Sequence, residues 1–243
     1  MTRRRLDQLL VERGLFDSRA RARAAIEAGG VRVDGRTAKK ASEAVPDGAE
    51  ITAEAAHPYV SRAALKLVQA LDAWPVRVEG RVVLDVGAST GGFTEACLQR
   101  GARRVFAVDV GHGQLHPRLA ADPRVTSLER TDARTLTHDL IDEAPQLVVC
   151  DASFIGLAKV LPAALRLAGS GADLVALVKP QFEAGPDAVG KGGVVRDATV
   201  RERALNDAIA FLQVEGWRVN QTAPCETQGA DGNQEWLVWA TRV

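Results

Sequence analysis

The sequence has few aromatic residues and few cysteines, and neither group is arranged for a specialised role. Aromatic residues make up 5% of the 243 positions. Cys97, Cys150 and Cys225 lie far apart and lack the histidine spacing of a metal site, so we expect no metal and interpret them as reduced core thiols of a cytoplasmic protein. The chain also lacks an apolar run long enough to cross a bilayer and an apolar segment typical of a secretory signal. These absences argue against a membrane role or a pore-forming toxin.

The sequence also has no net charge, but its charged residues are unevenly distributed. Lys and Arg number 31, as do Asp and Glu. Residues 1–40 hold eleven Lys or Arg against five Asp or Glu, a net charge of +6, which leaves −6 for the rest of the chain. A basic arm on a mildly acidic body is expected when one part of a protein contacts phosphate and the other does not. A solvated basic face is the alternative, because charge alone does not distinguish the two.

The length suits one α/β domain with a small module attached. Residues 53–58 read as the connector between them, because Pro58 disfavours helix at the preceding residue and the basic charge ends there. We therefore expect two domains, at residues 1–57 and 58–243.

The first module shows two helical segments followed by turns. Leucines at helical spacing in residues 6–10 predict a helix that stops near Gly14. A second helix is predicted over residues 19–26, capped by Asp17 or Ser18 and ended by two glycines. The strand-like residues 31–33 precede an Asp-Gly hairpin turn, and a second Asp-Gly turn follows at residues 47–48.

Two short helices followed by small hairpins resemble the α-L RNA-binding fold named after ribosomal protein S-four, over residues 3–53. Arg19 and Arg23 share one face of the second helix, which this resemblance places on RNA. The side chains expected to contact RNA phosphates are Arg3, Arg4, Arg5, Arg19, Arg23, Lys39 and Lys40, together with Arg62 from the second domain. A basic protein-docking module is the alternative. The scarcity of stacking aromatics favours duplex or shaped RNA over single strands.

Apolar runs alternate with helical stretches through the second domain. Runs at residues 82–86, 105–109, 147–151 and 174–179 are apolar apart from one charged residue at or near the end of each, as expected for a mostly parallel sheet covered on both faces. Two further strands, near residues 217–219 and 235–239, can pair antiparallel, an ending typical of methyltransferases and unusual for dehydrogenases. The predicted fold is a Rossmann-like α/β methyltransferase domain.

A glycine-rich loop follows the first of these strands, and Asp109 ends the next one, 24 positions after Asp85. Glycines allow a tight turn close to a ligand, and an acid at the second strand end can accept hydrogen bonds from ribose hydroxyls. The loop departs from the dinucleotide pattern Gly-x-Gly-x-x-Gly. The pattern predicts an adenosine-containing cofactor. For the loop residues after Asp109, the alternative to cofactor binding is an ordinary structural role. The expected contacts are Asp85, Gly87, Ala88, Ser89, Thr90, Gly91, Gly92, Phe93, Asp109, Val110, Gln114, Asp132 and Ala133.

Lys179 ends an apolar interior strand, where an ammonium has no structural use, and Asp151 ends the neighbouring strand. A lysine between another cation, a sulfonium and apolar walls can lose its proton near neutral pH. That is the property a base needs to activate a hydroxyl for methyl transfer.

Several motifs in order resemble the TlyA family, whose members are ribosomal RNA cytidine 2′-O-methyltransferases with an FtsJ-type catalytic domain, historically called hemolysin A. The motifs lie at residues 59–66, 87–94, 151–154, 179–183, 190–197 and 232–235. The resemblance implies S-adenosylmethionine as cofactor and ribosomal RNA as partner. It places the family's Lys-Asp-Lys-Glu tetrad on Lys66, Asp151, Lys179 and Glu235. Lys179 would be the base or the orienter of the hydroxyl, and Asp151 would hold it.

Some alternatives stay open at this point. Instead of belonging to a catalytic tetrad, Lys66 and Glu235 could form a surface ion pair. Residues 190–197 form either a lid over the substrate or a solvated connection. A nucleotide-cofactor oxidoreductase and a non-catalytic RNA-binding protein are the rival functions. A pseudouridine synthase would share the first module but would not explain the glycine loop with its paired acid.

Overall fold

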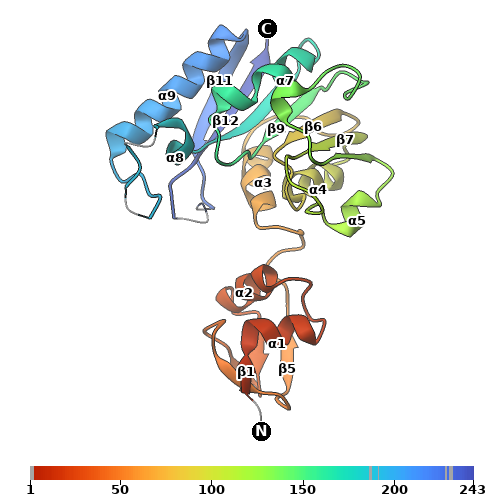
Figure 1. Ribbon diagram of the computed structural model, residues 1–243, viewed down its shortest axis with the longest axis vertical. Helices are drawn as coiled ribbons and strands as arrows, with labels where there is room; N and C mark the ends of the chain where they lie inside the picture. The colour runs from red at the N-terminus through yellow and green to blue at the C-terminus, as the bar shows by residue number, and fades with distance from the viewer. Residues whose placement is uncertain (1–2, 186–187, 191, 228, 230–231) are drawn as a thin grey trace. The chain divides into compact units, whose positions relative to one another are not determined.

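The computed structural model describes residues 3–185, 188–190, 192–227, 229 and 232–243. The chain forms two compact units, Met1–Val60 and Ser61–Val243, which are coloured red to orange and orange to blue in Figure 1. No helix in the described part of the chain is long and apolar enough to cross a membrane.

Within its described residues, the first unit contains two helices and five short strands; Figure 1 shows how they are arranged. Their bounds are β1 Arg3–Arg5, α1 Leu6–Glu12, α2 Arg19–Glu27, β2 Val31–Val33, β3 Arg36–Thr37, β4 Ala44–Pro46 and β5 Ile51–Ala53. Ser18 caps α2 by accepting a hydrogen bond from the Arg21 amide. Leucines of α1, Ala22 and Ile26 of α2 and Val31 of β2 are buried together, so the leucine spacing did mark the core face.

The strand pairing of this unit departs from the prediction in one respect. The turn at residues 34–35 forms the expected hairpin between β2 and β3. The turn at residues 47–48 joins β4 to β5, but β4 pairs with β1 and β5 pairs with β2, so no second hairpin forms. The arginine-rich start is therefore a paired strand and not a free arm.

The second unit is built on a seven-stranded sheet in the order β11-β12-β10-β9-β6-β7-β8. The strands are β6 Val82–Val86, β7 Arg104–Val108, β8 Val125–Leu128, β9 Leu147–Cys150, β10 Asp173–Val178, β11 Trp217–Pro224 and β12 Trp236–Arg242. The first five strands are parallel, and β12 runs antiparallel to both β10 and β11. This arrangement confirms the predicted Rossmann-like methyltransferase fold. Sequence reasoning missed β8, an edge strand with two hydroxyl residues among its four.

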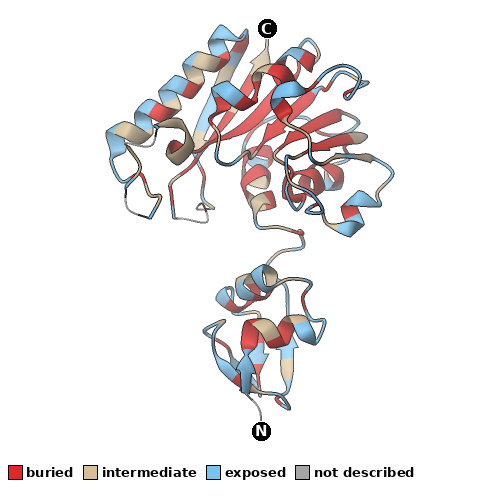
Figure 2. Cartoon of the chain, in the orientation of Figure 1, coloured by how far each residue is buried: buried red, intermediate tan, exposed pale blue. Residues whose placement is uncertain are grey.

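Helices cover both faces of this sheet, and Figure 2 shows its central strands buried along their length. The helical elements are α3 Ala63–Ala73, α4 Gly92–Gln99, α5 Pro117–Ala120, η1 Ala133–Thr135, α6 Leu157–Val160, α7 Pro162–Leu167, α8 Pro180–Glu183 and α9 Ala198–Val214. Alternate residues of β6, such as Leu84, pack with α6, α7 and α9, while α4 packs on the other face beside α3. Because β6, β9 and β10 are parallel, their carboxyl ends meet at one edge of the sheet.

Candidate active site

The glycine turn after β6 is shaped by two positions that only glycine fits well. Gly87 has a φ of +83°, and a Cβ there would lie 2.8 Å from Cα and 2.9 Å from N of Ala152. Gly91, at the start of α4, has a φ of +96°, and a Cβ there would overlap the side chains of Leu115 and Leu119. Both are left-handed backbone conformations in crowded surroundings. The turn can therefore approach the tip of β9 closely.

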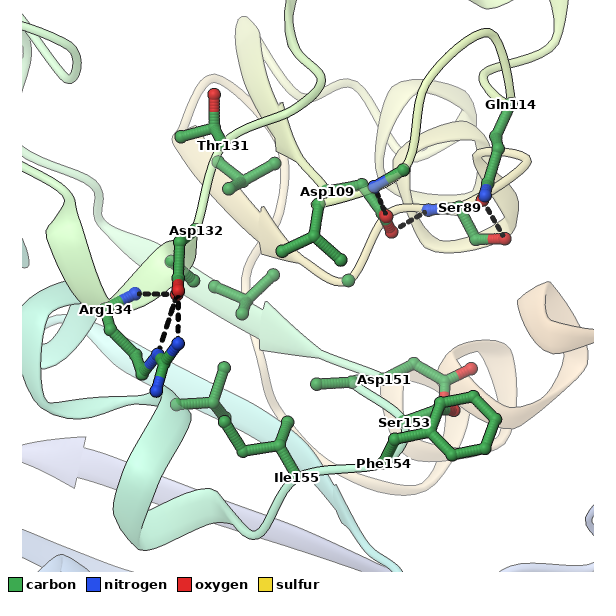
Figure 3. A pocket seen from close by; sticks show the side chains of 18 residues that line it. Ser89, Asp109, Gln114, Thr131, Asp132, Arg134, Asp151, Ser153, Phe154 and Ile155 are labelled. Carbon is green, nitrogen blue, oxygen red and sulfur yellow. Dashed lines mark hydrogen bonds and ion pairs between the residues drawn. The ribbon is translucent and has the colours of Figure 1, made fainter.

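Asp109, directly after β7, ties this turn to the next loop. Its Oδ2 accepts a hydrogen bond from the Ser89 amide at 2.8 Å, and its Oδ1 accepts one from the Gly111 amide at 2.7 Å. Figure 3 shows the carboxylate between these two backbone segments, with the Ser89 hydroxyl 3.3 Å from Oε1 of Gln114. Each carboxylate oxygen retains a second acceptor site, so Asp109 can still accept from a bound hydroxyl.

A cavity of about 530 Å³ opens at this edge of the sheet (Figure 3). Its size lies in the range of small-molecule sites. The expected cofactor residues that line it are Gly87, Ser89, Asp109, Val110, Gln114, Asp132 and Ala133. Val110 is 71% exposed, an unusual state for an apolar side chain that lines a cavity. The remaining expected contacts, Asp85, Ala88, Thr90, Gly91, Gly92 and Phe93, are not part of the cavity lining.

Asp85 lies inside the protein at the end of β6. Its side chain is fully buried, and its Oδ2 accepts a hydrogen bond from the Thr94 hydroxyl at 2.6 Å. Its Oδ1 has no hydrogen-bond partner among the described residues. Burial, partly opposed by the Thr94 hydrogen bond, raises the pKa of Asp85 to about 7. Asp85 therefore supports the loop region from within, where we had expected a direct contact.

Asp132 is already engaged at the far end of the cavity. Its carboxylate accepts a hydrogen bond from the Arg134 amide at 2.9 Å and forms an ion pair with the Arg134 guanidinium at 2.6 Å. The hydrogen bonds from Arg134 lower the pKa of Asp132. Sequence reasoning missed Arg134, which lies two residues away and is visible beside Asp132 in Figure 3.

The four tetrad residues come together from four different elements. Lys66 lies on α3, Asp151 and Lys179 directly follow β9 and β10, and Glu235 directly precedes β12. Lys179 Nζ is 2.6 Å from Asp151 Oδ1, Lys66 Nζ is 4.0 Å from the same oxygen, and Lys66 Nζ is 2.6 Å from Glu235 Oε2. Basic and acidic groups thus alternate in the order Lys179, Asp151, Lys66 and Glu235, and of these four residues Asp151 lines the cavity.

Burial separates the tetrad from ordinary surface charge pairs. Lys66, Lys179 and Glu235 are 8%, 6% and 2% exposed. The surface ion pair considered for Lys66 and Glu235 is therefore wrong. Charges removed from water in this way depend on one another for stabilisation.

The surroundings of Lys179 differ from the apolar walls that we had expected. Besides the Asp151 carboxylate, Nζ donates to the Asp151 carbonyl oxygen at 3.1 Å and to Ser153 Oγ at 2.9 Å. An ammonium has three N–H donors, and these two hydrogen bonds use two of them, while Asp151 Oδ1 accepts no hydrogen bond from the described residues. One N–H donor is therefore left for an oxygen of a substrate, which is what the orienting role requires.

Ser153 and Phe154 belong to the motif at residues 151–154 but were not among the predicted site residues. Both line the cavity, and Phe154 is 90% exposed with a φ of +66°. Its ring lies 5.2 Å from that of Phe182. The signal available in the sequence was their position directly after Asp151.

The glycine-rich segment 190–197 is anchored at its end by Asn233. The Val195 amide donates to Asn233 Oδ1 at 2.9 Å, and Asn233 Nδ2 donates to the Gly193 carbonyl oxygen at 2.9 Å. Asn233 is 1% exposed and lies two residues before Glu235. Lys191 of the same motif lies outside the described residues. Whether this segment acts as a lid stays a prediction.

The basic residues of the first unit are less free than expected. Arg5, Arg19 and Arg23 form ion pairs with Asp7, and Arg4 pairs with Glu12 at 2.6 Å. Lys39 and Lys40 are exposed, as is Arg62 at the start of α3. Among the described residues, no group of three or more His, Cys, Asp or Glu side chains is placed to hold a metal ion.

Taken together, the strand order, the glycine turn and the acidic end of β7 define a Rossmann-like methyltransferase. The FtsJ-like methyltransferase family model matches residues 59–242, and the S4 domain model matches residues 4–51. The chain is 48% identical over 239 residues to the 16S/23S rRNA (cytidine-2′-O)-methyltransferase TlyA of Mycobacterium tuberculosis, a match that covers 98% of this chain and 89% of the relative.

Two further relatives extend this similarity. Hemolysin A of Brachyspira hyodysenteriae is 40% identical over 235 residues, covering 96% of this chain and 98% of the relative. A solved structure from Streptococcus thermophilus, described as a candidate hemolysin, has a TM-score of 0.79 and 38% identity, covering 100% of this chain and 90% of that one. The chain belongs to the TlyA family of FtsJ-like methyltransferases, which confirms the family predicted from its motifs.

Proposed function

We propose that this protein transfers a methyl group from S-adenosylmethionine to the 2′-hydroxyl of a cytidine in ribosomal RNA, in the 16S or the 23S molecule or in both. The observation that carries the proposal is the contact between Lys179 and Asp151 at the wall of a cavity that also contains Asp109. The names of the similar proteins supply the nucleotide and the RNA. Residues 58–243 would perform the catalysis, and residues 1–57 would bind the RNA.

The residues that line the cavity support binding of an adenosine cofactor, independently of the similar proteins. Gly87 leaves open the space beside Ala152 that a Cβ would fill, Asp109 retains acceptor sites for ribose hydroxyls, and Val110 offers an exposed apolar surface. Asp132 would face the adenine end, with Arg134 holding its carboxylate. S-adenosylmethionine, when bound, supplies an electrophilic methyl group on its sulfonium.

The residues of the chain then have distinct roles toward the substrate. Lys179 would donate a hydrogen bond to the 2′-oxygen and fix its direction of approach, which is the main requirement of an in-line displacement. The hydroxyl proton would pass to the Asp151 carboxylate, whose Oδ1 accepts no hydrogen bond from the described residues. Lys66, held by Glu235, would keep Asp151 oriented.

Two rival functions lose support on specific observations. An oxidoreductase of this fold would not need two buried lysines on one aspartate. A non-catalytic RNA-binding protein would have no reason to keep a buried four-residue charge network beside an open cavity.

The proposal is tested by methyl transfer with purified protein. Ribosomal subunits from a strain that lacks the gene are incubated with labelled S-adenosylmethionine, and nuclease digests are examined for 2′-O-methylcytidine by mass spectrometry. We expect Lys179→Ala to lower the rate by about 10²-fold or more while cofactor affinity measured by calorimetry stays within about twofold. Lys159→Ala, an exposed lysine of α6, is the matched control and should retain full activity. Normal activity of Lys179→Ala would refute the assignment.

A further inference from the structure

Asp7, in the first turn of α1, is a buried carboxylate surrounded by three arginines. Its side chain is 0% exposed. Arg5 donates from Nε to Oδ1 at 3.0 Å and from Nη2 to Oδ2 at 3.2 Å. Arg19 donates to Oδ2 from Nη2 at 2.8 Å and from Nε at 3.2 Å, and Arg23 donates to it from Nε at 3.1 Å. We call Arg5, Arg19 and Arg23 the Asp7 arginine cluster.

The cluster joins separate parts of the fold through one ionised group. Arg5 belongs to β1, Asp7 to α1, and the other two arginines to α2. Burial by itself would raise the pKa of Asp7, but the hydrogen bonds from Arg5, Arg19 and Arg23 hold it well below its usual range. Asp7 therefore remains a carboxylate at any pH at which the protein works.

The ratio of charges in the cluster is unlike that of the neighbouring pairs. Arg21 pairs with Asp17 and Arg4 pairs with Glu12. In the cluster, three guanidinium groups share one carboxylate, which leaves a surplus charge of +2.

The arginines also keep much of their binding capacity. Their side chains are 43%, 46% and 48% exposed, whereas Asp7 is not exposed at all. A guanidinium has five N–H donors, and the hydrogen bonds to Asp7 use two from Arg5, two from Arg19 and one from Arg23. Guanidinium groups held in place at their inner edge bind a phosphate with less loss of side-chain freedom.

We propose that Asp7 is a positioning residue of the RNA interface, which holds Arg5, Arg19 and Arg23 as one preorganised cluster for two adjacent phosphates of structured RNA. The inference rests on the proposed function in that it takes ribosomal RNA as the partner. It goes further in assigning an acidic residue, which phosphate repels, a favourable role in binding phosphate.

The proposal is tested by whether removing the negative charge of Asp7 strengthens or weakens RNA binding. Asp7→Asn and Glu12→Gln each remove one negative charge from the first unit, so charge alone predicts that both variants bind RNA more tightly and with a steeper salt dependence. If Asp7 positions the arginines, Asp7→Asn should instead bind about tenfold more weakly, with a salt slope reduced by about one. Glu12→Gln should bind as tightly as the unaltered protein or more tightly.

The full-length variants are compared by filter binding to ribosomal subunits from a strain that lacks the gene, at several salt concentrations. Circular dichroism and cofactor calorimetry establish that each variant is folded. A folded Asp7→Asn that binds as tightly as Glu12→Gln would overturn the proposal. In an Arg23→Gln background, the effect of Asp7→Asn on affinity should shrink, and an undiminished effect would show that Asp7 does not act through Arg23.

A measurement on the unaltered chain keeps the proposal testable if Asp7→Asn fails to fold. In nitrogen-15 NMR spectra, the Nε–H signals of the cluster should exchange slowly with water and shift when a short RNA duplex is added. Rapid exchange, or signals that the duplex leaves unchanged, would overturn the proposal. Methyl transfer by Lys179→Ala reports separately on the proposed function, so the two failures are distinguishable.

Discussion

The buried pair of Lys66 and Glu235 offers a double-variant test of the tetrad. The two charges are 2.6 Å apart, and their side chains are 10% and 3% exposed. Lys66→Met leaves the Glu235 carboxylate buried without its closest cation, whereas Glu235→Gln leaves Lys66 with Asp151 at 4.0 Å. The two single variants should therefore not be equally unstable.

The size of each effect follows from what remains buried. Removing one partner of a buried ion pair costs about 3–5 kcal/mol. We expect Lys66→Met to lower the free energy of unfolding by an amount in this range. For Glu235→Gln we expect about half of it, because Asp151 partly replaces the lost carboxylate. The double variant should be more stable than Lys66→Met, since no uncompensated carboxylate is left at position 235.

Urea unfolding of the four proteins measures these differences, and methyl transfer is assayed on the same samples. All three variants should have strongly reduced activity, including the double variant whose stability is regained. Single variants that each cost less than about 1 kcal/mol would refute the reasoning, because that is the range of an exposed pair. A double variant with full activity would show that Lys66 and Glu235 are not needed for catalysis.

Two further predictions concern the glycine turn and the acid beneath it. Gly87→Ala should weaken cofactor binding at least about tenfold and destabilise the fold by about 1–3 kcal/mol. The control is Gly113→Ala: Gly113 has a φ of +64° but no atom within 4 Å of the added Cβ, so this variant should show only the backbone cost. Equal cofactor affinities of the two variants in calorimetry would contradict the prediction. Because the pKa of Asp85 is raised to about 7 from an ordinary value of 3.8, its contribution to stability is fully present below about pH 4 and is lost as the pH rises through 7. The unfolding free energy of the unaltered protein should fall by up to about 1.4 kcal/mol per pH unit between about pH 5 and 7, and Asp85→Asn should flatten this fall; identical pH slopes in urea titrations would contradict it.

Strand positions and strand ends were predictable because they depend on local pattern. The continuous apolar runs located β6, β7, β9 and β10, and the residues directly after them, among them Asp109 and Asp151, come to one edge because parallel strands share a direction. The final strand was also recognised, but the closeness of Lys66 and Glu235 to Asp151 followed only from the family resemblance. Periodicity does not specify which helix lies over which strand end.

Side-chain partnerships were the part that the sequence did not reveal. Arg19 and Arg23 share a helical face, as their spacing indicates, but nothing local shows that a carboxylate 12 and 16 residues earlier lies beneath them. Similarly, the hydroxyl of Ser153 that accepts from Lys179 lies 26 residues away in the chain. Such contacts depend on how distant elements pack, so the expected apolar surroundings of Lys179 were wrong although its position was right.

The most direct test of the central claim is to map 2′-O-methylcytidine in ribosomal RNA from cells that lack the gene and carry it back on a plasmid. We predict that at least one such modification disappears in the deletion, returns with the unaltered gene and does not return with Lys179→Ala. An unchanged modification pattern in the deletion strain, or full restoration by Lys179→Ala, would contradict the claim that this lysine and its aspartate direct methyl transfer to a ribose.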